Sequence, residues 1–521
     1  MKRRLWHFHG GLRLPGHKTE SMQEPIQAAN LPRRLTIPLQ QHIGEPAEPV
    51  VEIGQRVLKG QLLARASEYI SVPVHASTSG TVVAIEDRPI PHPSGLQAPC
   101  VVIDSDGRDE EIEHTPVNNY TELEPSALRN VIREAGIVGL GGAGFPAFIK
   151  LNPGPGNAVD TLILNGAECE PYITCDAMLM QTQPRRIIEG LLIMRHALQA
   201  RHCIIALENN QPDAWQSLNN ALEDDEKTFI ELVKVPTIYP TGGEKQLIKV
   251  LTGKEVPSHG LPLDIQMVCH NVGTAAAIAD TIHEGKPLIS RYVTVTGDTV
   301  GQPCNLEVRI GTPFEAVLEQ CGWRDDRNDE ILMGGPLMGF TVDNPAVPVI
   351  KTTNCILSWP TTSEQQTPMP CIRCGECARV CPAQLLPQQL YWYARAKNFD
   401  RVQDFNLFDC IECGCCAYVC PSHIPLVQYY RFAKTEIWAQ ERDKKKADQA
   451  RERHEFRQQR IERKKQEDEE RKRRKKEMLK KSQGDETDGE ESKKAAIDAA
   501  MARARARRGE KTPQSGGKKE T

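Results

Sequence analysis

The sequence predicts a multidomain protein of mixed α/β and α+β class that ends in a charged tail. Its 521 residues exceed what one hydrophobic core organises. Residues 31–115 hold short apolar runs with a period near two, divided by Gly and Pro, as in β structure. Residues 120–288 alternate helical patterns with apolar strands, which favours a mostly parallel sheet.

Composition limits the compartment. Aromatic residues make up 5% and charged residues 26% of the chain, and no stretch approaches 18 uninterrupted apolar residues. The opening MKRRLWHFHG has basic residues but no apolar core behind them, so we expect no secretory signal. We therefore expect a cytosolic protein, whose contact with a membrane would come through a partner.

The β-rich segment follows an N-terminal segment, residues 1–30. Residues 31–115 resemble the barrel-sandwich fold of lipoyl and biotinyl carrier domains. Those carriers need a lysine at a hairpin tip, where this chain has Ser67, Glu68 and Tyr69. We expect the scaffold without a carried group.

Three further segments follow the α/β domain. Residues 289–345 combine a strand, RYVTVTG, with a helix and a GGPLMG turn, which predicts a β-grasp-like unit. Residues 360–430 are rich in cysteine. Residues 434–521 hold 29 Lys and Arg against 20 Asp and Glu, and predict a solvated helix with a disordered end. Because both signs are interleaved and no aromatic platform is present, we expect no binding to nucleic acid.

The cysteine-rich segment carries the chemistry that the sequence predicts best. Nine of the 17 cysteines fall between Cys371 and Cys420, in two runs with the spacing C-x2-C-x2-C-x3-C-P of bacterial ferredoxins. Gly375 and Gly414 provide the permissive backbone that lets each run curl around a cluster. Two [4Fe–4S] clusters and a one-electron relay are the prediction. Two four-cysteine zinc sites are the alternative, but zinc needs neither the third close cysteine nor the trailing proline.

In such runs the fourth cysteine completes the other cluster. We therefore expect one cluster at Cys371, Cys374, Cys377 and Cys420, and the other at Cys410, Cys413, Cys416 and Cys381. Cys415 is out of register and is expected to be no ligand. The linker between the runs is longer than in small ferredoxins, so this pairing is an expectation.

Two motifs in the α/β domain are candidates for a cofactor site. The stretch from Gly139 to Pro146, GLGGAGFP, with Lys150 beyond it, is able to hold a phosphate on backbone N–H groups; a tight turn without a ligand is the alternative. The stretch from Asn165 to Asp176 places acids after a buried strand, where α/β proteins gather ligands; an acidic loop in solvent is the alternative.

The order of these elements resembles the C subunit of the Rnf/Rsx ion-translocating oxidoreductase complex. The resemblance covers nearly the whole chain before the tail and includes the opening Phe8, Gly10 and Gly11 with Lys18. The charged tail is similar to that of proteobacterial members.

The middle domain resembles the NADH-binding flavoprotein subunit of respiratory complex I, whose flavin loop GRGGAGFP corresponds to GLGGAGFP here. Two acids of that family are Gly243 and Gly273 in this chain. The resemblance implies FMN and NAD(H) contacts at the following residues: Gly139, Gly141, Gly142, Gly144, Lys150, Asn165, Glu168, Glu170, Asp176, Tyr239, Glu244, Asn271 and Thr274. No catalytic residue is singled out.

The resemblance implies a peripheral redox subunit at the cytoplasmic face of the bacterial inner membrane. Its partners would be the integral-membrane and other subunits of one complex, with a ferredoxin or a redox regulator as further candidates. Two other hypotheses stay open. The chain is a wiring and docking subunit without its own catalytic site, or it belongs to a reductase that keeps a redox-sensing regulator reduced.

Overall fold

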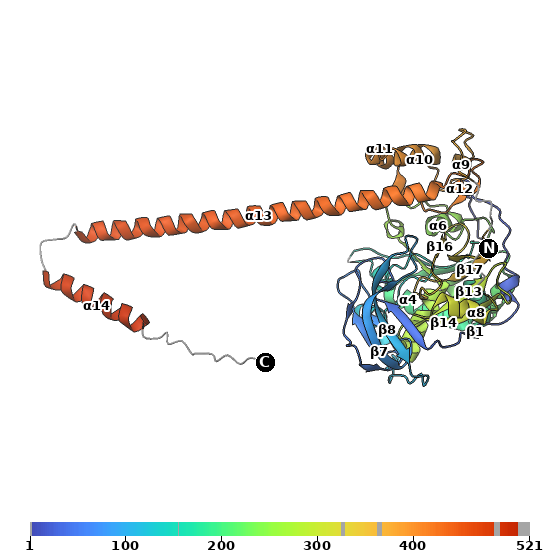
Figure 1. Ribbon diagram of the computed structural model, residues 1–521, viewed down its shortest axis with the longest axis horizontal. Helices are drawn as coiled ribbons and strands as arrows, with labels where there is room; N and C mark the ends of the chain where they lie inside the picture. Colours follow the sequence, from blue (N-terminus) through green and yellow to red (C-terminus); the bar gives the residue numbers. More distant parts are fainter. Residues whose placement is uncertain (1–2, 155, 325–328, 362–366, 484–489, 509–521) are drawn as a thin grey trace. The chain divides into compact units, whose positions relative to one another are not determined.

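A computed structural model describes residues 3–154, 156–324, 329–361, 367–483 and 490–508 (Figure 1). The chain divides into two units, Met1–Thr435 and Glu436–Thr521. The predicted class, a mixed α/β and α+β multidomain chain, is confirmed by the four domains described below. No helix in the described ranges has the length and apolar character needed to cross a membrane. Short 3-10 helices are η1 (Glu20–Met22), η2 (Tyr120–Glu122), η3 (Glu226–Thr228), η4 (Pro262–Ile265) and η5 (Leu407–Asp409).

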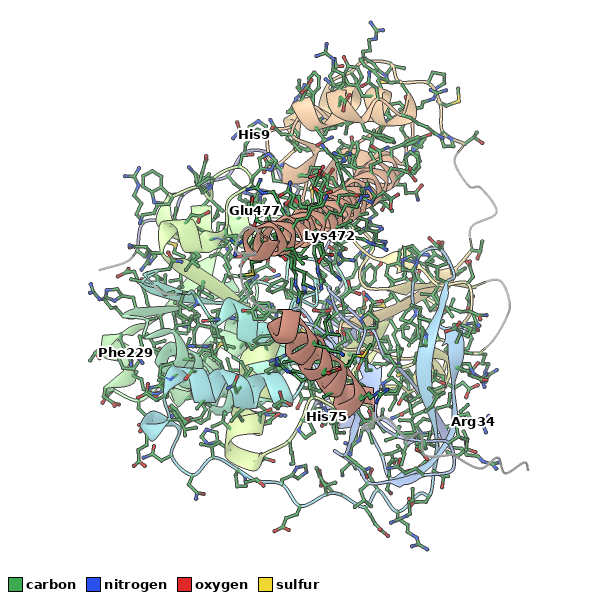
Figure 2. The ribbon with its side chains drawn as sticks, turned by 90° about the vertical axis from the view of Figure 1, so that its left-hand side faces the viewer. His9, Arg34, His75, Phe229, Lys472 and Glu477 are labelled. Atoms are coloured by element: carbon green, nitrogen blue, oxygen red, sulfur yellow. The ribbon has the colours of Figure 1, made fainter. Side chains whose placement is uncertain are left out.

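The β-rich domain is built of two antiparallel sheets, ordered β2-β8-β7-β4 and β3-β5-β6. Alternating residues such as Leu35 and Ile37 point into a common core and are fully buried. Arg34, labelled in Figure 2, lies on the exposed face and pairs with Asp104. The strands are β2 (Arg34–Pro38), β3 (Glu48–Pro49), β4 (Arg56–Val57), β5 (Leu62–Arg65), β6 (Val74–His75), β7 (Gly80–Pro89) and β8 (Gln97–Ser105).

The α/β domain has one four-stranded sheet in which every pair of strands is parallel. Its order is β11-β10-β9-β12: β9 (Thr161–Gly166), β10 (His202–Glu208), β11 (Ile230–Val235) and β12 (Met267–Asn271). Its helices are α1 (Pro125–Glu134), α2 (Ala147–Lys150), α3 (Cys175–Thr182), α4 (Pro184–Leu198), α5 (Pro212–Ala221), α6 (Glu244–Thr252) and α7 (Val272–Glu284). Register pairs Asn165 with Asn271, so both side chains reach the carboxyl edge together.

The third domain is a six-stranded mixed sheet ordered β1-β14-β13-β17-β15-β16, covered by α8 (Phe314–Gln320). Two of its strands come from outside the predicted range 289–345. They are β1 (Gln27–Ala28), which pairs in parallel with β14, and β17 (Cys355–Pro360). The others are β13 (Ser290–Thr296), β14 (Cys304–Arg309), β15 (Asp329–Met333) and β16 (Phe340–Thr341).

The cysteine-rich domain repeats one local design. Each cysteine run ends in a short helix, α9 (Glu376–Arg379) or α12 (Cys415–Tyr418), that starts after a left-handed glycine. Between the runs lie α10 (Pro387–Arg395) and α11 (Phe399–Asp404).

The tail is more helical than predicted. Helix α13 runs over Leu426–Gln483 and α14 over Glu490–Arg508. The expected disorder is wrong for α14, because Ala and Arg are strong helix formers and no Gly or Pro interrupts them before Arg508. Residues 484–489 and 509–521 of the tail lie outside the described residues.

Residues 5–18, called here the N-terminal strap, tie the α/β domain to the cysteine-rich domain. The backbone N–H of Gly11 donates to Val380 O at 3.0 Å, and that of Leu12 to Tyr239 O at 2.7 Å. His9, labelled in Figure 2, places Nδ1 3.0 Å from Cys381 O. At Gly10, with φ +70°, a Cβ would overlap Val380, so this close approach requires glycine.

Candidate functional site

The glycine loop that precedes α2 is fixed at its base and open at its tip. An isolated bridge joins Val138 to Pro146, and Leu140 N donates to Thr274 Oγ1 at 2.9 Å. The tip, residues 141–143, is exposed, and among the described residues its N–H groups have no hydrogen-bond partner. A Cβ at Gly142 would meet nothing within 4 Å. The loop therefore presents free donors around open space, which fits the phosphate of a flavin nucleotide.

Two asparagines frame the carboxyl edge next to this loop. Asn165 Nδ2 donates to Gly242 O at 2.8 Å. Asn271 Oδ1 accepts from the N–H groups of Gly273 and Thr274 and so caps α7, while its Nδ2 donates to Asp176. The structure thus brings Asn165, Asn271, Thr274 and Asp176 together beside the glycine loop.

The acidic turn after β9 is largely occupied by the protein's own groups. Glu168 accepts hydrogen bonds from the N–H groups of Asp176 and Ala177, at the start of α3. Burial, with the nearby charge of Glu168, raises the pKa of Asp176 to about 7. Lys18 Nζ donates to the carbonyls of Glu168, Glu170 and Ile173, which fixes the turn.

Three other predicted residues are engaged elsewhere. Lys150 pairs with Glu244 at 2.6 Å and also donates to Cys269 O. Glu170 accepts from the backbone N–H groups of Leu337 and Met338, and burial raises its pKa. These contacts link the predicted flavin residues to one another and to the third domain.

Arg291 is a site residue that sequence reasoning missed. It lies at the start of β13 and is 5% exposed. Its guanidinium donates to the carbonyls of Leu140, in the glycine loop, and Thr353, and burial lowers its pKa. It brings a buried cation behind the loop, at a place where Gly273 stands instead of an acid. No spacing rule marks a lone arginine at a strand start.

The nine cysteines of the two runs line two cavities. One is lined by Cys371, Cys374, Cys377 and Cys420, and is called the outer cavity. The other is lined by Cys381, Cys410, Cys413 and Cys416, and is called the inner cavity. Cys415 also borders the inner cavity and packs in a cluster with Tyr239 and Leu337. Four thiols around each cavity are the donor set that a cubane iron–sulfur cluster requires.

The inner cavity adjoins the α/β domain. Tyr239 Oη donates to Cys413 O at 2.6 Å, and Tyr239 lies beside Glu170. A Cβ at Gly414 would lie 2.6 Å from Leu337 O, so the second run packs tightly on the GGPLMG turn. In the outer cavity, by contrast, Cys374 is exposed.

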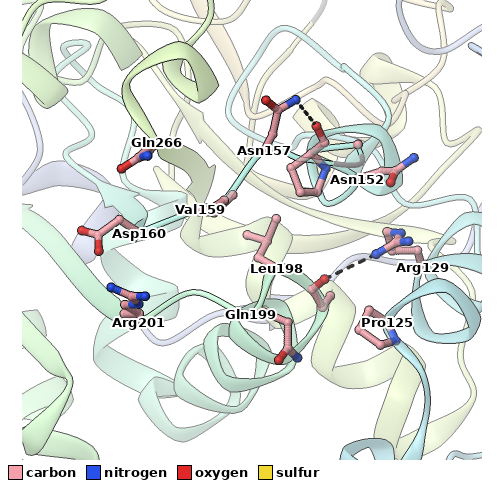
Figure 3. Close-up of a pocket in the computed structure, with 14 residues that line it drawn as sticks. Pro125, Arg129, Asn152, Asn157, Val159, Asp160, Leu198, Gln199, Arg201 and Gln266 are labelled. Atoms are coloured by element: carbon pink, nitrogen blue, oxygen red, sulfur yellow. Dashed lines mark hydrogen bonds between the residues drawn. The ribbon is translucent and has the colours of Figure 1, made fainter.

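A separate pocket of about 650 Å³ lies at the amino-terminal ends of β9 and β12 (Figure 3). None of the predicted site residues lines it. In parallel sheets, ligands bind at the opposite, carboxyl edge. Its Arg129 already donates to Ala197 O. We assign no function to this pocket.

The domains match four family models. Residues 132–280 match the Nuo51 FMN-binding domain, 6–108 the RnfC barrel sandwich hybrid domain, 292–341 the SLBB domain and 370–424 the 4Fe-4S dicluster domain. These matches confirm the predicted cofactor classes, FMN and two [4Fe–4S] clusters. Fold and sites together define an iron–sulfur flavoprotein of electron transfer.

The chain is a homologue of the RnfC proteins, which are subunits of ion-translocating oxidoreductase complexes. It is 48% identical over 458 residues to the protein from Pseudomonas aeruginosa, covering 88% of this chain and 59% of that protein. For the protein from Vibrio cholerae the identity is 47% over 464 residues, covering 88% and 59%. The chain thus spans about three fifths of the length of these relatives. A solved NAD+-reducing [NiFe]-hydrogenase is similar at 20% identity and a TM-score of 0.41, over 56% of this chain and 57% of that one.

Proposed function

We propose that this chain is the peripheral redox subunit of a membrane complex that couples electron transfer to ion translocation. Within it, electrons pass between a flavin and nicotinamide site in the α/β domain and two [4Fe–4S] clusters. One observation carries this proposal: the inner cavity adjoins the α/β domain through Tyr239, whose hydroxyl binds the carbonyl of Cys413. Redox centres exchange electrons when their protein environments touch in this way.

The proposed cluster ligands are the eight cysteines that line the two cavities in groups of four. The inner cluster takes Cys381, Cys410, Cys413 and Cys416, and the outer cluster takes Cys371, Cys374, Cys377 and Cys420. Because the inner cavity adjoins the α/β domain and the outer one has an exposed cysteine, the inner cluster lies on the flavin side.

For FMN, we propose that the free N–H groups of residues 141–143 hold the phosphate. Gly139, Gly144, Asn165, Thr274 and Asn271 shape the loop and the edge beside it. When bound, a flavin converts two-electron exchange with NAD(H) into one-electron exchange with clusters. Asp176, buried beside Asn271, is the polar group nearest this edge with a pKa near neutrality.

We further propose a location at the cytoplasmic face of the inner membrane, held there by the other subunits of the complex. This rests on the named relatives, which are complex subunits. A ferredoxin or a redox regulator is the proposed soluble partner at the far end of the relay.

One observation favours a second candidate, a wiring and docking subunit without its own flavin chemistry. Lys150 and Glu244 pair with each other, Glu170 is bound to the third domain, and Gly243 and Gly273 stand where the flavoprotein family has acids. In this case the clusters would work without a nicotinamide site.

Anaerobic reconstitution of the full chain separates the two. The proposal expects about eight irons per chain, one bound FMN, and bleaching of the flavin by NADH. Cluster assembly without FMN uptake would contradict the enzymatic function and support the wiring subunit. About four irons would contradict the two-cluster relay.

A further inference from the structure

The outer cavity reaches the surface at a loop that is apolar and rigid. Ile372, between Cys371 and Cys374, is 67% exposed, and Met369 is 59% exposed. The loop is pinned, because Met369 N donates to Ser422 O at 2.9 Å and Ser422 Oγ to Pro370 O at 3.0 Å. Two large apolar side chains are therefore held in water directly over a proposed cluster, which marks a contact surface.

The inner cavity lacks such an opening. Cys413 and Cys416 are buried, at 7% and 8% exposure, and Tyr239 and Leu337 pack against the second run. Cys374, in the outer cavity, is exposed. Electrons that leave the chain through its clusters therefore leave at the outer cavity.

Cations surround the apolar loop. Arg373 is exposed, with its guanidinium 5.2 Å from the ring centroid of Trp392, and the Arg379 side chain is 72% exposed. The acid in this group is Glu376, which pairs with Arg379 at 3.2 Å. Met369, Ile372, Arg373, Cys374 and Arg379 are together called the outer-cluster face. Its net charge is positive.

We propose that the outer-cluster face docks a second electron-transfer protein whose own redox centre lies under an acidic rim. The inference rests on the proposed function, because it assigns the surface through which the relay continues. The apolar pair excludes water between the two centres, while Arg373 and Arg379 steer an acidic partner into register. Small, transient interfaces of this kind are typical of redox pairs.

Binding is tested with the reconstituted full chain and an acidic plant-type [2Fe–2S] ferredoxin as the probe. Both proteins are kept oxidised, without NADH, and the Kd is measured by calorimetry at about 20 mM and about 500 mM salt. We expect binding that weakens at high salt. Failure of flavin reduction by NADH would leave this measurement intact, so the two proposals fail separately.

Matched variants locate the surface. Arg379→Glu is compared with Arg108→Glu, since both side chains are 72% exposed and each lies near one glutamate. Ile372→Gln is compared with Ile53→Gln, at 67% and 65% exposure. We expect Arg379→Glu and Ile372→Gln to weaken binding about tenfold at low salt, and the controls to change it less than about twofold.

Iron content and the cluster EPR spectrum are recorded for each variant, so that a lost cluster is not mistaken for lost docking. Equal Kd values for Arg379→Glu and Arg108→Glu, with both clusters intact, would overturn the proposal. So would binding of anionic phosphatidylglycerol vesicles that the same two substitutions abolish while ferredoxin binding persists, since the face would then contact lipid.

Discussion

At the residue scale, Asn271 shows how the edge of the α/β sheet is organised. Its Oδ1 caps α7 and its Nδ2 donates to Asp176, so one side chain fixes both the helix and the buried acid. The sequence placed Asn271 and Asp176 in the site, because strand ends collect ligands. It did not place Arg291, because a buried guanidinium bound by the carbonyls of Leu140 and Thr353 leaves no pattern along the chain.

Arg291→Met tests that cation. Removing the positive charge behind the glycine loop should weaken FMN binding by about tenfold or more, as for a lost charge-assisted interaction. Titration of apo protein with FMN, followed by quenching of flavin fluorescence, measures the change. Arg291→Lys keeps the charge and should recover part of the affinity. Unchanged affinity in Arg291→Met would show that the guanidinium only joins domains.

Cys415 and Cys416 are adjacent, and the structure places both along the inner cavity. Spacing predicts that only Cys416 is a ligand. Cys415→Ala should therefore keep about eight irons per chain, and Cys416→Ala should fall to about four. Iron and acid-labile sulfide analysis of the two variants decides. A loss of iron in Cys415→Ala that matches Cys416→Ala would reverse the assignment.

At the scale of elements, the strands and helices of the α/β domain followed from periodicity, while the third sheet did not. Strands β1 and β17 join it from distant parts of the sequence, and β1 is only two residues long. Short edge strands are set by pairing rather than by their own pattern. The cysteine groups were accessible to prediction because each ligand set is fixed by local spacing, whereas the contact of Tyr239 with Cys413 arises only from domain packing.

Lys351 joins two elements and gives a dependence on pH. It is fully buried, and its Nζ donates to Pro73 O and Gly136 O. Burial lowers its pKa from 10.5 to about 7. Between these values the unfolded chain holds a proton that the folded chain lacks, so stability rises with pH over that window, by at most about 1.4 kcal/mol per pH unit.

Lys351→Met removes that titration. The melting temperature of wild type relative to Lys351→Met should therefore be higher at about pH 9 than at about pH 7. Differential scanning fluorimetry in matched buffers measures both proteins. The variant Lys59→Met is the control, because Lys59 is paired with Asp109 at 2.8 Å. A difference that stays constant with pH would contradict a neutral Lys351 in the folded protein.

At the scale of the whole molecule, the tail is a unit of its own. Every side chain from Glu441 to Leu479 is exposed, with pairs such as Arg473 and Glu477 along one helix. The preceding turns of α13 are different: Tyr430 donates to Pro387 O and Lys434 to Cys410 O. The first turns of α13 thus support the inner cavity, and the exposed part does not.

Truncation separates these parts. A chain ending at residue 443 should keep its iron content and a melting temperature within about 2 °C of the full chain, because it loses only exposed residues. A chain ending at residue 425 should lose iron from the inner cavity. Iron analysis and thermal melting distinguish them. Loss of both clusters in the longer truncation would show that the exposed helix supports the fold.

The N-terminal strap has a consequence for biosynthesis. His9 contacts Cys381 across 372 residues of sequence, so the ribosome releases one partner long before it makes the other. During that interval the strap is unpaired, and both cysteine runs are still to come. Closing the strap over Val380 is therefore a late event, and it gives the nascent chain a period in which maturation factors reach the thiols before the domains lock together.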